Sequence, residues 1–480
     1  MAARRLTRAI CGMLLLGLIC LTPLLYGAPE RPAGPRKGEP GIFHTEVPAQ
    51  TCDIVLARPT PTAVTLSILA YRNLEGYVAY GTQPGVYTKQ TTARAFTKDQ
   101  PAEVVLDALS ADTRYYYQFR MRESADAPFS ANPEYTFHTQ RSPGSGFTFT
   151  IIADSHLDEH TTPALYLQTL RNALADRPDF HLDLGDTFMT EKHADRDDAL
   201  KQYLAQRYYF GQLCHSAPCF LAIGNHDGET AREQDGTANS LAAWSNAMRK
   251  RYFPNPLPDA FYTGNGTPHP LAGQLQDYYA WSWGDALFVV LDPFWFTPRQ
   301  RGGDDNWTRT LGSAQYQWLK RTLEGSSAKF KFVFIHHLVG GLDKDARGGT
   351  EAAPYYEWGG KNADGTEGFA EHRPGWAMPI HRLLVQHHVS AVFHGHDHFF
   401  GKQELDGIIY QEVPQPGWTG RFDADRIAEY GYTHGILLPS SGHLRVTISA
   451  NQAKVDYVRS ATDDLENGKV VNSYTIAAKP

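Results

Sequence analysis

Five apolar runs of the β type each end in residues of the types that can bind metals, and this repetition constrains the fold more than any other feature. The runs span 147–156, 180–186, 219–227, 330–337 and 390–398, and they read FTFTIIADSH, FHLDLGD, CFLAIGNHD, FKFVFIHH and SAVFHGHDH. In α/β folds the carboxyl ends of strands meet at one edge of the sheet, where these proteins place their sites. We therefore expect the five ends to lie together in an α/β structure.

The side chains at these ends are carboxylates, an amide and imidazoles: Asp154, His156, Asp186, Asn225, His336, His396 and His398. Taken singly, an Asp after a strand is more often a cap or turn residue than a ligand. Together, oxygen and nitrogen ligands without a thiolate suit Zn, Fe, Mn, Ni or Co, and the residue types do not choose among these metals. Structural zinc sites are closed and use Cys or His, so this mixture favours a catalytic centre with two divalent metals.

A centre of this kind has a defined chemistry. A bridging carboxylate sets two metals about 3.5–4 Å apart, which suits in-line displacement at phosphorus by a hydroxide held between them. The metals also neutralise charge that develops on the phosphoryl oxygens. The leaving alkoxide then needs a proton, and His226, next to Asn225, is the candidate catalytic donor. The expected activity is the hydrolysis of phosphate mono- or diesters.

The order D-x-H, G-D, G-N-H-D, H, G-H-x-H resembles the calcineurin-like metallophosphoesterase superfamily, from about Phe147 to the end of the chain. The resemblance implies an α/β fold, a two-sheet β-sandwich flanked by helices. The resemblance also implies that His336, not its neighbour His337, is the ligand, because the first His of such a pair carries the metal. It also implies three ligand sets: a first metal on Asp154, His156 and His398, a second metal on Asn225, His336 and His396, and Asp186 as the bridge.

One position departs from that pattern. Many relatives read G-D-x-x-D, where the last carboxylate orients the His of G-N-H, and purple acid phosphatases read G-D-x-x-Y, with tyrosinate on iron. The residue here is Met189, which neither binds a hard metal in that way nor orients an imidazole. We therefore expect no purple iron centre. Asp227 and Asp158 are both candidates to orient His226.

The first 28 residues have the pattern of a signal peptide. Arg4, Arg5 and Arg8 precede about a dozen apolar residues, and Gly27-Ala28 is a small-residue exit. An uncleaved membrane anchor is the alternative. Residues 29–48 are predicted to be a Pro/Gly-rich linker. Beyond the first 28 residues, no run approaches the roughly 20 apolar residues of a membrane span. The expected localisation is secreted or periplasmic, with no transmembrane segment after signal removal.

Residues 49–141 alternate apolar and polar positions between turn residues, which predicts an all-β immunoglobulin-like sandwich. Leu109, Thr113, Tyr115 and Tyr117 are placed as at the tyrosine corner of a fibronectin type III domain. The arrangement resembles that of purple acid phosphatases, where such a domain precedes the catalytic one. A carbohydrate-stacking surface is the alternative reading of the tyrosines. Residues 147–480 are then the metallophosphoesterase domain.

Within 147–480, apolar residues at a spacing of three to four predict helices over 162–178, 243–253 and 314–323. Residues 340–376 form a long polar, Gly-rich segment between His336 and His396. Loops of this length are usually functional or disordered. Two readings stay open, a substrate-gating loop over the metals and an ordered insertion.

Charge and cysteines limit the partners and the compartment. The net charge is −7, and the chain has no basic run, so undirected nucleic-acid binding is not expected. The expected partner is a phosphorylated small molecule or ester substrate. Cys214 and Cys219 are either a disulfide or two buried thiols. Two other functions remain: a secreted binding or adhesion module with a structural metal site, and a metal-dependent hydrolase of non-phosphate esters.

Overall fold

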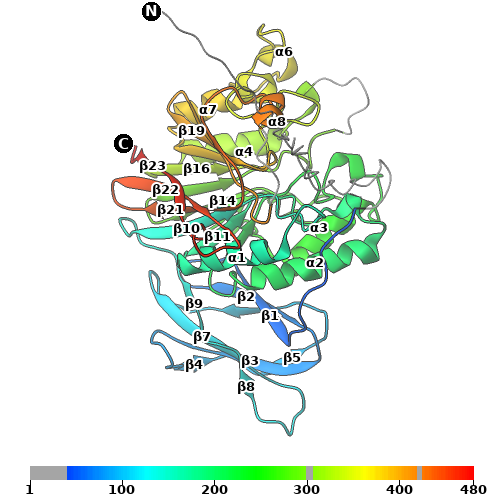
Figure 1. Cartoon of the computed structure of the whole chain (residues 1–480), viewed down its shortest axis with the longest axis vertical. Coiled ribbons are helices and arrows are strands. Elements are labelled where there is room, and N and C mark those ends of the chain that lie inside the picture. Colours follow the sequence, from blue (N-terminus) through cyan, green and yellow to red (C-terminus); the bar gives the residue numbers. More distant parts are fainter. Residues whose placement is uncertain (1–40, 299–305, 419–423, 480) are drawn as a thin grey trace, which may run out of the picture.

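A computed structural model describes residues 41–298, 306–418 and 424–479. The predicted signal peptide and most of the predicted linker lie outside the described residues. The first described part is a β-sandwich, drawn in blue and cyan in Figure 1, and a larger α/β part follows it. Within the described residues, no helix is both long enough and apolar enough to cross a membrane.

The sandwich consists of two antiparallel sheets. One sheet has the order β1-β2-β6, with β1 at Cys52–Ala57, β2 at Val64–Ala70 and β6 at Ala102–Leu106. The facing sheet has the order β4-β3-β7-β8, with β5 also paired to β3 and β9 to β7. Its strands are β3 (Leu74–Gly81), β4 (Lys89–Gln90), β5 (Arg94–Phe96), β7 (Arg114–Arg122), β8 (Ser130–Ala131) and β9 (Tyr135–His138).

The tyrosines of β7 belong to the core of this sandwich. Tyr115 and Tyr117 are buried among the apolar side chains of both sheets. The Tyr115 hydroxyl accepts a hydrogen bond from the Ser110 N–H (2.8 Å), which is the backbone contact that defines a tyrosine corner. Two of the three tyrosines are therefore unavailable to stack on a carbohydrate. The likeness to fibronectin type III stays a prediction.

The α/β part is built on two further sheets. The first has the order β12-β11-β10-β21-β22-β23, and the second has the order β13-β14-β15-β16-β17-β19-β18-β20. The strands of the first are β10 (Phe147–Ile152), β11 (Phe180–Asp183), β12 (Cys219–Leu221), β21 (Gly442–Ile448), β22 (Gln452–Arg459) and β23 (Val470–Ala477). Those of the second are β13 (Thr263–Gly264), β14 (Tyr279–Trp283), β15 (Ala286–Val290), β16 (Phe330–Phe334), β17 (Ala391–His394), β18 (Phe400–Leu405), β19 (Ile408–Glu412) and β20 (Ile436–Leu438).

The inner faces of these two sheets pack on each other through aromatic residues. Phe149 of β10 contacts Phe180 (5.3 Å between ring centroids) on its own sheet, and Phe288 (5.1 Å) and Phe332 (5.7 Å) on the opposite one. Such ring pairs bury much apolar area and contribute about 0.5–1.5 kcal/mol beyond that burial. This core fixes the relative position of the two sheets, and therefore of the strand ends that carry the candidate ligands.

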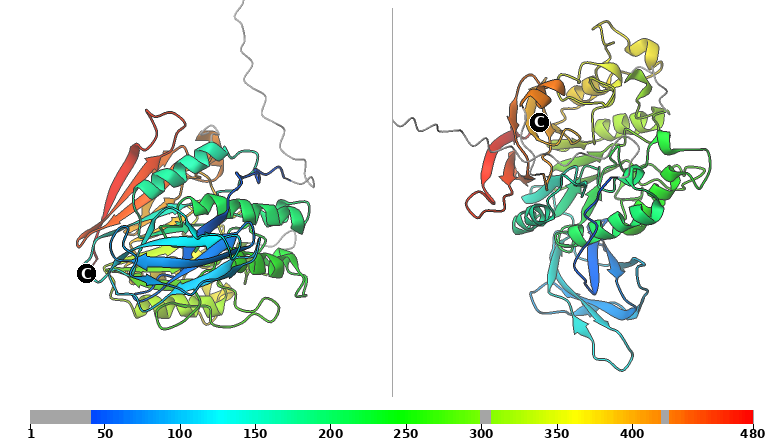
Figure 2. Two further views of the ribbon diagram at one scale, coloured as in Figure 1. Left: turned by 90° about the horizontal axis from the view of Figure 1, so that it is seen from below. Right: turned by 45° about the vertical axis from the view of Figure 1, so that its right-hand side comes forward.

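Helices cover the outer faces, as Figures 1 and 2 show. On the first sheet lie α1 (Pro163–Ala175), α2 (Arg196–Gly211) and α3 (Leu241–Tyr252). On the second lie α4 (Ser313–Glu324), α5 (Tyr356–Gly359) and α7 (Ile380–Gln386). The remaining helices are α6 (Phe369–His372), α8 (Ala424–Glu429) and the 3-10 turns η1 (Thr190–Lys192), η2 (Ala231–Glu233) and η3 (Asn306–Thr308).

The predicted two-sheet sandwich flanked by helices is thus confirmed. Three of the helices, α1, α3 and α4, overlap the ranges that the apolar spacing predicted, to within two residues at each end of α3 and α4. Helix α2 was not predicted. It buries Gln202, Gln206 and Arg207 on the same side as its apolar residues, so its sequence lacks a clear apolar stripe. Cys52, Cys214 and Cys219 are free thiols in the described structure, so Cys214 and Cys219 do not form a disulfide.

A buried ion pair joins the N-terminal sandwich to helix α2. Arg207 donates from Nε to Asp53 Oδ1 (2.7 Å) and from Nη2 to the Ser67 carbonyl (2.8 Å), and its side chain has no exposed area. The Tyr71 hydroxyl donates to the other oxygen of Asp53 (2.6 Å). Both charges are therefore paired and hydrogen-bonded out of water.

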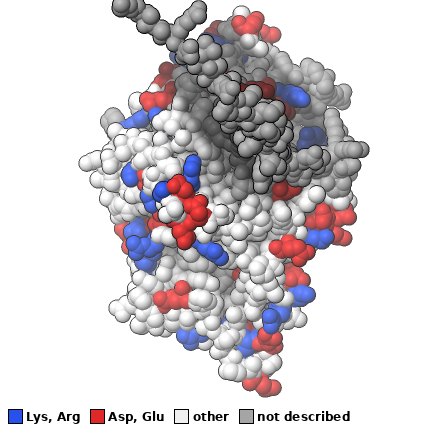
Figure 3. Space-filling model, in the orientation of Figure 1, with Lys and Arg blue, Asp and Glu red and all other residues white. Residues whose placement is uncertain are grey.

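On the face drawn in Figure 3, acidic and basic side chains are interspersed over the described surface.

Replacing Arg207 by Met should destabilise the whole chain, because Asp53 would stay buried without its cation. Removal of one partner of such a pair costs about 3–5 kcal/mol. Arg171→Met on the exposed side of α1 is the control, with an expected change within about 0.5 kcal/mol. Urea unfolding of the two variants measures the difference, and equal stabilities would contradict this role of Arg207.

Candidate metal centre

The candidate ligands stand on sharp turns at the strand ends. Five of them have a left-handed backbone: Asp154 (φ 60°), His156 (φ 27°), Asp186 (φ 56°), His396 (φ 83°) and His398 (φ 66°). Residues other than glycine in this region carry a strain of about 1–3 kcal/mol each and occur mainly at functional sites. The turns therefore hold these side chains in positions that regular strands do not offer.

The glycines of the motifs are required by close approach of these turns. A Cβ on Gly224 would lie 2.0 Å from the Asp186 backbone nitrogen, and one on Gly395 would lie 2.7 Å from Asp154 Oδ2. Both distances are shorter than real Cβ contacts allow. The G-N-H and G-H-x-H sequences thus begin with glycine because a larger residue would push a candidate ligand out of place.

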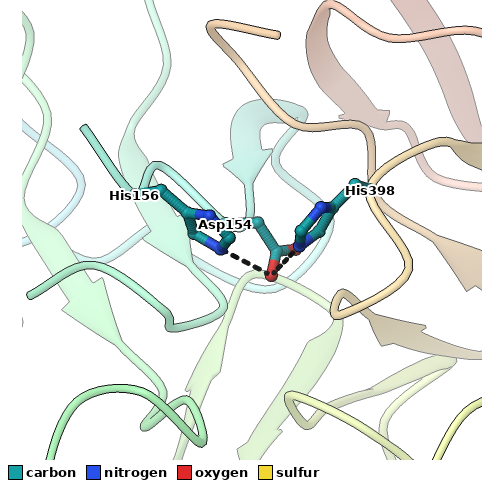
Figure 4. A group of neighbouring side chains, drawn as sticks. All are labelled: Asp154, His156 and His398. Carbon is teal, nitrogen blue, oxygen red and sulfur yellow. Dashed lines mark ion pairs between the residues drawn. The ribbon is translucent and has the colours of Figure 1, made fainter. Parts of the chain in front are cut away.

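The candidate ligands form two clusters. One consists of Asp154, His156 and His398, and Figure 4 shows both imidazoles directed at the Asp154 carboxylate. His398 Nε2 lies 3.4 Å and His156 Nε2 lies 3.8 Å from Asp154 Oδ1. In the described structure Asp154 Oδ1 and His156 Nε2 are buried and have no hydrogen-bond partner. Buried polar atoms without partners are costly, and a cation between these atoms would satisfy both.

The second cluster consists of Asp186, His336 and His396. His336 Nε2 lies 3.5 Å from Asp186 Oδ2 and 3.0 Å from Asn225 Oδ1, so the amide of Asn225 also faces this cluster. Asp186 Oδ2 is 3.6 Å from His156 Nε2 of the first cluster. One carboxylate oxygen therefore faces both clusters. All seven predicted ligand side chains are brought together at one place.

Three of the histidines use their other ring nitrogen to bond an oxygen outside the clusters. His156 Nδ1 bonds Asp158 Oδ2 (3.1 Å), His336 Nδ1 bonds the Leu184 carbonyl (2.9 Å) and His396 Nε2 bonds the Asp345 carbonyl (2.7 Å). Histidines that bind metals usually have such outer acceptors, which fix the tautomer and the ring orientation. The nitrogens that remain are those that face the clusters.

The electrostatics of the site favour positive charge. Burial opposes ionisation of Asp154, but the adjacent His398 and His156 hold its pKa below its usual range. Burial would also lower the pKa of His336, yet the carboxylates of Asp186 and Asp154 raise it to about 9. The buried carboxylates thus attract a cation at this point. A divalent ion that bound there would displace the imidazole proton.

His337 lies beside the second cluster but outside it. Its Nδ1 bonds the Leu338 carbonyl (3.0 Å), and its ring packs edge-on against Phe294. Burial and the neighbouring His336 lower the pKa of His337 to about 3. The structure therefore places the first histidine of the pair in the cluster, in agreement with the sequence pattern.

Neither candidate for orienting His226 does so. Asp227 is buried and accepts the backbone N–H groups of Thr187 (2.8 Å), Phe188 (2.8 Å) and Gly224 (2.7 Å) instead. Asp158 is bonded to His156. The partner of His226 Nδ1 is Glu191, in the 3-10 turn η1. Glu191 follows Met189 by two residues, and sequence reasoning missed it because it considered only the fixed spacing of the family motif.

The long segment between His336 and His396 reaches the site through its first nine residues, 340–348. Arg309 is buried and donates to the carbonyls of Gly340 (2.8 Å) and Asp343 (3.1 Å). Arg347 pairs with Asp397 (2.8 Å), between the two histidines of G-H-x-H. The residues nearest the site are thus held by several polar contacts, which favours an ordered insertion over a gate.

Comparison with known proteins agrees with this geometry. The family model of calcineurin-like phosphoesterases matches residues 147–400. The chain belongs to this family, whose members hydrolyse phosphoesters with a divalent metal centre. The predicted family and enzyme class are therefore confirmed, and a non-catalytic binding module is set aside.

Two solved structures share the fold over most of the chain. The structure of PhoD is 16% identical with a TM-score of 0.65, and the match covers 89% of this chain and 90% of that one. The purple acid phosphatase PPD1 of yellow lupin (Lupinus luteus) is 14% identical with a TM-score of 0.58, and the match covers 89% of this chain and 74% of that one. None of the curated proteins compared with the chain matches it.

Replacing Asp158 by Ala should weaken metal binding without removing a ligand. His156 would lose the acceptor that fixes its tautomer, and such outer partners contribute about 10–100-fold to metal affinity. A competition titration with a chelator, on purified protein, measures the change. An affinity equal to that of the unaltered chain would show that Asp158 does not support His156.

Proposed function

We propose that this protein hydrolyses phosphate esters at a dinuclear centre in which Asp186 bridges the two metals. Asp154, His156 and His398 hold the first cation, and Asn225, His336 and His396 hold the second. The identity of the metals is not assigned, since the same ligands accept Zn, Fe, Mn, Ni or Co. The proposal includes export from the cytoplasm, which is based on the sequence pattern of residues 1–28.

One observation carries the proposal. Asp186 Oδ2 lies 3.6 Å from His156 Nε2 and 3.5 Å from His336 Nε2, and these nitrogens belong to different clusters. Asp186 is almost completely buried, so its carboxylate is largely shielded from bulk water. A shared carboxylate between two three-residue clusters is the arrangement that two-metal phosphoesterase chemistry requires.

When bound, the two cations supply an activated water and neutralise charge at the phosphoryl group. The chain's own residues place the proton donor. Asp186 Oδ1 accepts the backbone N–H of His226 (2.7 Å), so the same carboxylate that faces both clusters fixes the position of His226. Glu191 accepts a hydrogen bond from His226 Nδ1 and so fixes the orientation of the imidazole.

The position of His226 suits a general acid. Its side chain is a quarter exposed, and its ring centroid is 6.4 Å from that of His156. With Nδ1 bonded to Glu191, Nε2 is the nitrogen that can give its proton to a leaving alkoxide. The partly exposed ring allows the leaving group of a substrate to approach it.

Asp186→Ala should lose bound metal and all measurable turnover, because both clusters share this carboxylate. Asp126→Ala, on an exposed loop of the N-terminal sandwich, is the control that should keep both. Elemental analysis of metal per chain and hydrolysis of an aryl phosphate give the two readouts. Two metals retained with normal turnover in Asp186→Ala would rule out the bridge.

His226→Ala should keep its metals, and its rate of hydrolysis should fall about 10²–10⁴-fold, the usual contribution of a general acid. Glu191→Gln should give a rate between those of His226→Ala and the unaltered chain, because a neutral amide forms a weaker hydrogen bond to Nδ1 than the carboxylate does. Both losses should shrink for nitrophenyl esters, whose leaving groups need little protonation. His160→Ala, which removes an exposed imidazole four residues after His156, is the control. Equal losses on good and poor leaving groups would show that His226 positions the phosphate instead.

A further inference from the structure

A short segment ahead of the β-sandwich is attached to the metal centre. Residues 41–47, called here the N-terminal strap, precede β1 and lie along the α/β part. The Gly41 N–H donates to the Lys192 carbonyl (3.0 Å), and the His44 N–H donates to the Leu157 carbonyl (2.7 Å). Between them Phe43 forms an antiparallel bridge with Asp158.

The two acceptors belong to different turns of the site. Leu157 follows His156 in the turn that carries Asp154, His156 and Asp158. Lys192 follows Glu191 in η1, and Glu191 is the partner of His226. The strap therefore ties the turn of the first cluster to the turn that supports the proton donor, by one backbone hydrogen bond to each.

A side-chain path leads from the strap to the same place. The Phe43 ring stacks on that of His193, with centroids 4.0 Å apart and planes 27° from parallel. His193 Nε2 contacts Gln202 Oε1 (2.7 Å). Gln202 then donates from Nε2 to the carbonyls of His156 (2.5 Å) and Thr187 (2.9 Å). Thr187 follows Asp186, so the path ends on the backbone of residues in or next to both clusters.

The side chains of this path are buried, so their conformations are restricted. The side chain of His193 is 1% exposed and that of Gln202 is fully buried. Because Gln202 Nε2 donates to two carbonyls, its oxygen must accept, so His193 Nε2 carries the proton between them. A Cβ on Gly41 would lie 2.7 Å from the Phe43 ring, so the start of the strap is closely packed too. Ile42, in contrast, is 65% exposed.

We propose that the N-terminal strap is a working part of the metal centre, with Phe43, His193 and Gln202 as positioning residues for the first cluster. The strap holds the turn of Asp154 and His156 against η1 and so sets the geometry in which that cluster binds its cation. The inference rests on the proposed function, because it takes the ligand assignments from there. Release of the strap lowers the affinity for one metal and leaves the other metal in place.

Phe43→Ala and Ile42→Ala form a matched pair, since the two residues are neighbours on the strap and only Phe43 has a ring that stacks on His193. The full chain is depleted of metal and titrated with Mn²⁺ by calorimetry. Phe43→Ala should bind one of the two ions about 10–100-fold more weakly, the range for outer partners of a metal ligand. Ile42→Ala should bind both ions as the unaltered chain does. Phe43→Tyr, which keeps the stacked ring, should restore the affinity.

Gln202→Leu tests the far end of the path, where a similar volume remains but both donated hydrogen bonds are lost. It should weaken the ion of the first cluster, as Phe43→Ala does, because the His156 carbonyl loses its donor. Thermal unfolding in the presence of a chelator shows whether each variant is folded, and Phe43→Leu replaces Phe43→Ala if the latter is not. Equal affinities in the Phe43 and Ile42 variants, or a loss of stability with unchanged affinities, would overturn the proposal.

Failure of the proposed function would be visible elsewhere. If Asp186→Ala with an intact strap still bound two Mn²⁺ ions, the ligand assignments would be wrong. If Asp186→Ala lost its metal while Phe43→Ala kept normal affinity for both ions, the assignments would stand and the role of the strap would be refuted.

Discussion

The carboxylates of Asp154 and Asp186 are buried, and their charge must be balanced inside the protein. An uncompensated carboxylate in a low-dielectric interior is very costly, so a protein keeps one only where cations or several hydrogen bonds stabilise it. Here four imidazoles from three separate turns converge on the two carboxylates. The left-handed turns, the glycines at close approach and the outer acceptors all serve to keep this buried charge in one arrangement.

The support of the site extends over elements far apart in the chain. Glu412 of β19 is fully buried and accepts the N–H groups of Asp397 (3.0 Å) and His398 (3.2 Å), and so shapes the G-H-x-H turn. Gln202 of α2 bonds the backbone on the opposite side of the site. Neither residue touches the cation positions, yet each fixes a turn that does. Precise metal sites need such a supporting shell, because a ligand that moves by about 1 Å no longer matches the preferred geometry.

The N-terminal sandwich is joined to this framework through helix α2. Arg207 of α2 binds Asp53 and Ser67 of the sandwich, and five residues earlier on the same helix Gln202 binds carbonyls of the site. The strap is a second connection of this kind. It precedes the sandwich in the chain, and its backbone bonds the turns of the site. Loss of the Arg207–Asp53 pair or of the strap's hydrogen bonds is therefore expected to shift residues at the candidate metal centre, because each contact is joined to the site by packed, hydrogen-bonded residues.

The sequence by itself determined the fold class, the family and the set of side chains that gather at the site. Strand periodicity and the order of the five motifs are local properties, and the carboxyl ends of parallel strands meet at one edge of each sheet. The packing of the two sheets on each other then brings the ends of β10, β11 and β12 to those of β16 and β17. The partner of His226 and the role of the strap were decided only by the tertiary structure. Glu191 and Phe43 act on residues distant in sequence, through turns whose backbone angles no periodicity encodes. Helix α2 was missed for a related reason, because the glutamines that serve the site interrupt its apolar stripe. Contacts of this kind depend on how separate elements pack, which is a property of the whole fold.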